Sequence, residues 1–204
     1  AKAFNDCDGL ETITFNKNIK KIPDAFFKNC ESLTTVIAPG VEEIGDEAFL
    51  YCTALENVQF SDELHTIGKD SFNLCENLKT IGVSGEKITS LGAGAFAKTL
   101  IDSFVFSDEL TKIPEGCFEE TSLTSIIIPE SVTVIGTNAF LNCKNLESVV
   151  LSDNLKTIEK SAFRYCTSLS SIDFPESLVE IGAYAFETCE NLSGEIRLEK
   201  NLVY

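Results

Sequence analysis

The chain has 204 residues, 44% of them hydrophobic, and a net charge of −16 at pH 7. This composition supplies enough apolar material for a folded core. The negative charge argues against nucleic acid and against anionic membrane surfaces, which both select Lys and Arg. No apolar run reaches the roughly 18 residues of a membrane-spanning helix, and the opening "AKAFNDCDGL" has no apolar signal segment.

A phenylalanine recurs along the whole chain at spacings of 22 to 24 residues. A small residue usually precedes it, and a leucine-type residue and an isoleucine-type residue keep step with it in each copy. Such self-similarity at a fixed period is the mark of a repeat architecture. The recurring aromatic residues are Phe4, Phe27, Phe49, Phe72, Phe96, Phe118, Phe140, Phe163 and Phe186.

In chain order, each unit begins with a stretch L-x-x-I-x-φ, where φ is apolar, as in "NVQF" at 57–60 and "SIDF" at 171–174. Apolar residues alternate there, which predicts a strand buried on one face. Ser-Asp or Pro-Glu pairs then turn the chain. After a following Ile-Gly, the apolar residues fall at helical intervals, as at Ile44, Ala48, Cys52 and Leu55, which predicts a short helical turn.

A unit of about 23 residues buries its apolar positions only by stacking on its neighbours. The sequence therefore predicts a leucine-rich-repeat solenoid of the α/β type, with about nine stacked repeats, one long parallel β-sheet and short convex helical turns. Without a linker or a shift in composition, residues 1–204 are expected to form a single leucine-rich-repeat domain. Because the chain starts inside a repeat, we expect it to be a fragment of a longer protein, and its uncapped ends suggest end-to-end self-association.

Seven of the eight cysteines occupy one column, three residues after the phenylalanine: Cys7, Cys30, Cys52, Cys75, Cys143, Cys166 and Cys189. We interpret them as free thiols that fill space in the core. Disulfides are the main alternative, although side chains in a ladder point the same way and a disulfide needs converging Cβ vectors. A zinc site lacks paired C-x-x-C ligands, and a nucleophile would need a base, for which His65 is the only histidine. No catalytic residue, metal ligand or cofactor is predicted.

The string I-G-x-x-A-F-x-x-C-x-x-L, complete in "IGDEAFLYCTAL" at 44–55, resembles the consensus of the BspA-type leucine-rich repeats. The resemblance covers essentially the entire chain. It implies a surface or secreted protein of a host-associated bacterium or a protist, with a role in adhesion to host or matrix proteins or to other microbes.

The outward positions of the predicted sheet are the candidate partner-binding surface, since solenoids recognise partners on extended sheet faces. In this row, Val105, Ile127 and Val150 belong to consecutive repeats and predict an exposed apolar strip beside Asp173, with Gln59 and Arg197 further along. The alternative is that these β-branched residues only stabilise the sheet laterally.

These features favour a non-enzymatic module, at the cell surface or secreted, that binds protein or glycan. The runner-up is a structural spacer or an intracellular scaffold in the cytoplasm, and an enzyme is the third possibility.

Overall fold

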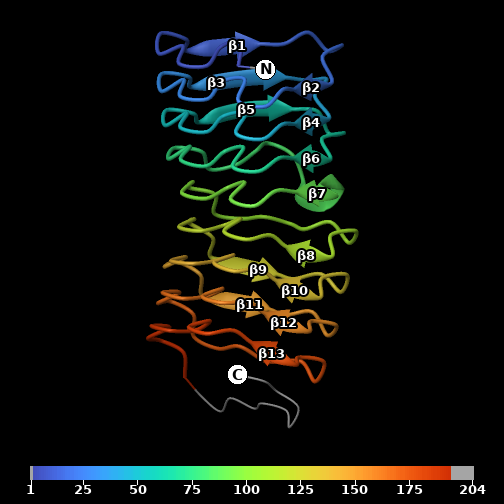
Figure 1. Ribbon diagram of the computed structural model, residues 1–204, viewed down its shortest axis with the longest axis vertical. Helices are drawn as coiled ribbons and strands as arrows, with labels where there is room; N and C mark the ends of the chain where they lie inside the picture. The colour runs from blue at the N-terminus through green and yellow to red at the C-terminus, as the bar shows by residue number, and fades with distance from the viewer. Residues whose placement is uncertain (1, 194–204) are drawn as a thin grey trace.

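The computed structural model describes residues 2–193. Successive repeats stack along one axis as a leucine-rich-repeat solenoid, from the N-terminal repeats at one end to the C-terminal repeats at the other (Figure 1). The solenoid has about 7 turns. The seven column phenylalanines from Phe27 to Phe163 are fully buried, whereas Phe4 is 37% exposed and Phe186 is half-buried. The prediction of nine stacked repeats is therefore too high, because the outermost copies within the described residues are covered on one side only.

One ladder of short parallel strands forms at the stretch L-x-x-I-x-φ. Equivalent residues of neighbouring repeats pair, so that Ile13 lies opposite Val36 and Val36 opposite Val58. Side chains alternate between buried and exposed along β5, β9 and β11, as the pattern predicts. The strands are β1 (Thr12–Thr14), β3 (Thr35–Ala38), β5 (Asn57–Phe60), β9 (Ser125–Ile127) and β11 (Ser148–Val150).

A second ladder of two-residue strands, which the sequence pattern did not predict, ends at the isoleucine or leucine that precedes Gly, Pro or Glu in each repeat. Where glycine follows, the backbone of the preceding repeat lies close: a Cβ at Gly68 would stand 2.6 Å from the nitrogen of Asp46. The strands are β2 (Lys21–Ile22), β4 (Glu43–Ile44), β6 (Thr66–Ile67), β7 (Ser90–Leu91), β8 (Lys112–Ile113), β10 (Val134–Ile135), β12 (Thr157–Ile158) and β13 (Glu180–Ile181).

The predicted helical turns at the A-F-x-x-C segments are wrong. The one helix of residues 2–193 is the 3-10 helix η1 (Gly85–Lys87), which lies in a different part of its repeat. In each copy, the residues two before and two after the column phenylalanine have a left-handed φ, such as 55° at Glu47 and 63° at Tyr51. An α-helix cannot continue through such residues.

These segments join neighbouring repeats in place of forming helices. The backbone N–H groups of Glu47, Phe49 and Tyr51 donate to carbonyls of the next repeat at 2.7, 2.8 and 3.0 Å. The same three hydrogen bonds link Gly94, Phe96 and Lys98 to the repeat after them. The A-F-x-x-C side of the solenoid therefore carries a continuous backbone ladder of its own.

The column phenylalanines form a stacked spine inside the solenoid. Successive rings lie 5.1 to 5.7 Å apart between centroids, with ring planes within 24° of parallel. This offset spacing is favourable for aromatic pairs. The spine explains why the phenylalanine column keeps its register even where other columns of the repeat change.

The single long sheet that the sequence predicted is interrupted. The first ladder is divided into β1-β3-β5 and β9-β11, and the second into β2-β4-β6-β7 and β8-β10-β12-β13. The strands expected at Ile81, at Phe104 and at Ile172 are absent, although Ser171 forms a single bridge with Ser148. Two consecutive repeats near the middle of the solenoid therefore lack pairing on the strand side.

Candidate partner-binding face

The three aliphatic residues of the predicted strip are exposed on the strand side. Val105, Ile127 and Val150 keep 55%, 68% and 56% of their surface accessible. Ile127 of β9 pairs with Val150 of β11, so these two side chains are cross-strand neighbours. Val105 belongs to the preceding repeat, which does not pair with β9.

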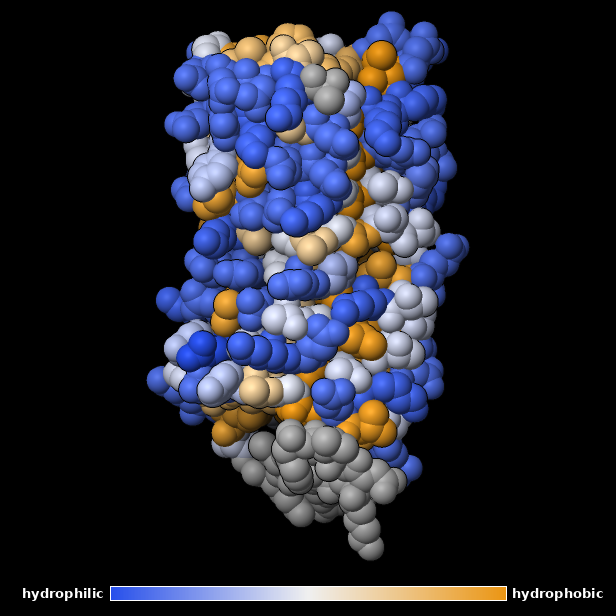
Figure 2. Space-filling view, in the orientation of Figure 1, coloured by the Kyte–Doolittle hydropathy of each residue, from blue (hydrophilic) through white to orange (hydrophobic). Residues whose placement is uncertain are grey.

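The strip contains the most exposed aliphatic side chains of the described residues. Figure 2 shows one face of the solenoid, which is largely hydrophilic, with hydrophobic side chains in a narrow, broken line along the long axis. The other exposed aliphatic side chains, such as Leu100 and Val179, are 39% and 43% accessible, less than each member of the strip, whereas the aromatic Tyr184 is 56% accessible. Apolar groups concentrated in this way commonly mark contact sites.

Two hollows accompany the strip. The first, of about 510 Å³, lies between the segments 103–108 and 125–130 and includes Val105 and Ile127 in its lining. The second, of about 420 Å³, lies between the segments 148–153 and 171–175 and includes Val150 and Asp173. Volumes of this size are typical of pockets that hold ligands.

The remaining residues of the predicted row lie apart. Gln59 is exposed on β5, on the other side of the interruption in the first ladder, and its cross-strand neighbour is Ile37. Asp173 is exposed and shares the second hollow with Val150. Arg197 lies outside the described residues.

Several residues around the first hollow were not recognised from the sequence. Phe104 stands in a column that otherwise holds isoleucine and valine, and Phe106 follows it two residues later. Asp108 and Glu130 follow the two segments and line the same hollow. The aromatic residue in an otherwise aliphatic column is the sequence signal that could have identified this position.

The cysteine column lies inside the solenoid, beside the phenylalanine spine. Cys52, Cys75, Cys143 and Cys166 are fully buried, and Cys7 and Cys189 are partly buried. Each thiol from Cys30 onward contacts the carbonyl oxygen of the phenylalanine in the preceding repeat, as Cys52 does with Phe27 at 3.1 Å. The column thus joins repeats as well as filling space.

Threonine replaces cysteine in the two repeats that lack it. The hydroxyls of Thr99 and Thr121 donate to the carbonyls of Phe96 and Phe118, within their own repeats, at 2.8 and 3.0 Å. Both threonines are buried, and these hydrogen bonds satisfy their hydroxyl groups, as is usual for buried polar groups.

Burial makes these thiols poor nucleophiles. Desolvation raises the pKa of Cys143 to about 11, against a smaller opposing effect of its hydrogen bond to Thr121. Desolvation likewise raises the pKa of Cys75 and Cys166 well above the ordinary thiol range. The thiolate is the reactive form of cysteine, so the geometry gives this column a packing role.

Residues 2–193 contain no group of three or more His, Cys, Asp or Glu side chains placed to hold a metal ion. His65 makes its close contact, at 3.0 Å, with the hydroxyl of Thr66. Within the same described range, no helix has the length and apolar character required to cross a membrane.

Fold and surface together place the protein in the leucine-rich-repeat class, whose solenoids are generally scaffolds for protein interaction. Its family is also defined. The model of the BspA type leucine rich repeat region matches residues 1–122 and 111–204 with 6 copies, and the chain belongs to this family.

Solved structures of bacterial leucine-rich-repeat proteins share the fold. A protein from Bacteroides ovatus is 28% identical with a TM-score of 0.65, over 94% of this chain and 46% of its own. The Treponema protein named T. pallidum Leucine Rich Repeat protein is 24% identical with a TM-score of 0.58, over 90% of this chain and 78% of its own. A leucine rich cell surface protein from Faecalibacterium prausnitzii is 23% identical with a TM-score of 0.51, over 90% of this chain and 72% of its own.

The chain thus spans about half the length of the Bacteroides ovatus protein. No protein of curated function matches it.

Proposed function

We propose that this chain is a non-enzymatic recognition module that binds a protein or glycan through its strand face, as part of a cell-surface or secreted adhesion protein. The observation that carries the proposal is the exposed strip of Val105, Ile127 and Val150 on the strand side, which contains the most exposed aliphatic side chains of the described residues. Family membership supports the interaction role, because leucine-rich-repeat solenoids generally serve as protein-binding scaffolds.

The partners that we propose are host, matrix or microbial surface proteins, or their glycans. A net charge of −16 favours partners with basic surfaces and disfavours nucleic acid. Small hydroxyl side chains adjoin the strip at Ser103, Ser125 and Ser148, and they suit contacts with backbone or sugar hydroxyl groups. End-to-end association of copies stays a separate prediction, which analytical ultracentrifugation of the purified chain tests.

The test is binding to arrays of immobilised matrix proteins, bacterial surface proteins and glycans. Ile127→Asp and Val150→Asp each place a charge in the strip, and we expect each to weaken capture about tenfold or more. Thr14→Asp is the matched control, because Thr14 occupies the same outward row on β1, away from the strip. Exposed substitutions of this kind change stability by about 0.5 kcal/mol or less.

A partner whose capture is equally strong with the wild type and with both strip variants would contradict this assignment of the site. A spacer would also show that behaviour, since its solenoid supplies length alone. Catalytic turnover by the purified chain that disappears in a strip variant would contradict the non-enzymatic role.

A further inference from the structure

The segment Ser103–Phe106 is an extended stretch that has lost its sheet partners. Within residues 2–193, none of its four residues makes a backbone–backbone hydrogen bond, although Phe106 is buried and Phe104 is half-buried. The regular repeats join at the equivalent position, where the N–H of Phe15 donates to Ile37 at 2.8 Å and that of Ile128 donates to Val150 at 2.9 Å. The segment therefore offers free backbone groups where other repeats have a ladder.

Strand β9 presents a free edge to the same gap. Because alternate residues of a strand direct their N–H and C=O groups to opposite sides, the bond from Ile128 to Val150 means that Ile127 directs its own groups away from β11. Neither the N–H nor the C=O of Ile127 has a partner in Ser103–Phe106. One backbone bond, from Thr124 to Asp102 at 3.3 Å, joins these two repeats at the entrance to the strands.

Unusual residues occupy the strand side of these repeats, whereas their opposite side is regular. Gly82, in the strand position of the preceding repeat, has a φ of 72°, which ends a regular strand there. Phe104 places a ring in a column that otherwise holds aliphatic residues, and it packs 5.1 Å from Phe118. On the opposite side, Phe96 still donates to Cys117 at 2.9 Å, so the backbone ladder of the A-F-x-x-C segments holds the two repeats together.

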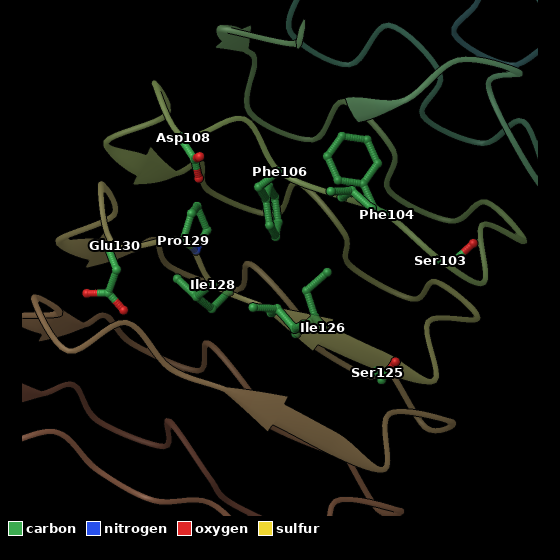
Figure 3. Close-up of a pocket in the computed structure, with 11 residues that line it drawn as sticks. Ser103, Phe104, Phe106, Asp108, Ser125, Ile126, Ile128, Pro129 and Glu130 are labelled. Carbon is green, nitrogen blue, oxygen red and sulfur yellow. The ribbon is translucent and has the colours of Figure 1, made fainter. Parts of the chain in front are cut away.

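The hollow in this gap has two chemically different ends. Figure 3 shows Asp108 and Glu130 at one end, Ser103 and Ser125 at the other, and the apolar side chains between them. The lining of this hollow of about 510 Å³ contains no Lys, Arg or His. Glu130 accepts hydrogen bonds from Asp153 and Asn154 of the next repeat, whereas no ion pair involves Asp108 among the described residues.

We propose that this gap binds an extended polypeptide segment with an apolar centre and with Lys or Arg at the end that meets Asp108 and Glu130. The proposal rests on the function proposed above and specifies its partner. The bound segment adds a strand beside the free edge of β9, so that backbone hydrogen bonds supply affinity and the apolar lining selects its side chains. The two carboxylates set its orientation, because opposite charges across an interface favour one register.

The experiment uses a fluorescent decapeptide of alternating Val and Thr that ends in Lys-Lys, with fluorescence anisotropy as the readout. Two control peptides have the same side chains in the central part: one ends in Glu-Glu, and the other carries N-methyl groups on alternate backbone amides. We expect the Lys-ended peptide to bind about tenfold more tightly than either control. Equal binding of the N-methylated peptide would overturn the strand-addition mode, and equal binding of the Glu-ended peptide would overturn the assigned orientation.

Two protein variants locate the bound peptide. Asp108→Lys should lower the affinity for the Lys-ended peptide about tenfold and raise the affinity for the Glu-ended peptide. Ile127→Pro removes the N–H that faces the gap, and proline is tolerated where a strand edge is free. Ile127→Ala is its control, because it shortens the side chain but keeps the N–H. If Ile127→Pro does not fold, the Asp108→Lys result still decides the question.

If the Lys-ended and Glu-ended peptides bind Asp108→Lys with the same affinities as they bind the wild type, the proposed location is overturned. Failure of all three peptides to bind the wild type would overturn strand addition as well. Neither result affects the broader proposal, which depends on whether partners from the arrays require Ile127 and Val150. Glycan ligands that do not compete with the Lys-ended peptide would bind a different part of the strand face.

Discussion

Raising the pH should destabilise this protein through its cysteine column. A thiol of the unfolded chain ionises with a pKa of about 8.5, whereas burial raises the pKa of Cys143 in the fold to about 11. Between these values the unfolded chain releases protons that the folded chain retains. The unfolded state then binds fewer protons, so the free energy of unfolding decreases as the pH rises. The stabilisation is fully present below pH 8.5 and is lost progressively above it.

The size of the effect follows from the number of fully buried thiols. At pH 9.5, each thiol with a folded pKa of 11 or more lowers the stability by about 1.4 kcal/mol. Burial raises the pKa of Cys52 and Cys166 further than that of Cys143, and it raises the pKa of Cys75 in the same direction. Cys52, Cys143 and Cys166 alone account for a loss of about 4 kcal/mol. The entire stability of a domain is commonly about 5–15 kcal/mol, so the predicted change is large.

Urea unfolding followed by circular dichroism, at pH 7.5 and pH 9.5 with a reductant present, measures this loss. The matched variant is Cys166→Thr, because Thr99 and Thr121 already occupy the same column in two repeats. The variant should lose about 1.4 kcal/mol less than the wild type between the two pH values. Equal losses in the two proteins would refute the reasoning, as would native thiols that react with a thiol reagent at pH 9.5 as fast as in urea.

The other predictions concern the interior and the close contacts between repeats. Phe72→Ala removes a fully buried ring of the spine and should cost about 3–5 kcal/mol in urea unfolding, whereas Phe4→Ala should cost less because Phe4 is 37% exposed. Equal costs would contradict the spine. Gly68→Ala places a Cβ within 2.6 Å of the Asp46 nitrogen and should cost about 1–3 kcal/mol. Gly9→Ala, which meets nothing within 4 Å, should leave the melting temperature nearly unchanged; a drop equal to that of Gly68→Ala would show that crowding is not the cause.

The sequence predicted the parts of the fold that depend on repetition. A column of phenylalanines at a period of about 23 residues indicates repeats that stack around a shared interior. The strands at Val36, Val58, Ile126 and Val149 follow from alternating burial, and they form where they were expected. The exposure of Ile127 was likewise readable from its place between two buried neighbours.

The helical turns were predicted wrongly because apolar spacing does not report backbone φ. Ile44, Ala48, Cys52 and Leu55 stand at helical intervals, but Glu47 and Tyr51 between them have left-handed φ values of 55° and 63°. The nearest backbone partners of these segments belong to the next repeat. Hydrogen bonding between repeats, which a single repeat cannot show, selects this conformation in place of a helix.

What the sequence by itself determined is the identity of each layer: which residues enter the spine, which thiols lie beside it and which side chains point outward. A period is a property of the chain, and stacking converts it directly into columns. Only the tertiary structure decided where the columns separate. The gap beside β9 depends on whether the repeats of Phe104 and Ile126 pair, and pairing is set by distances between segments more than 20 residues apart.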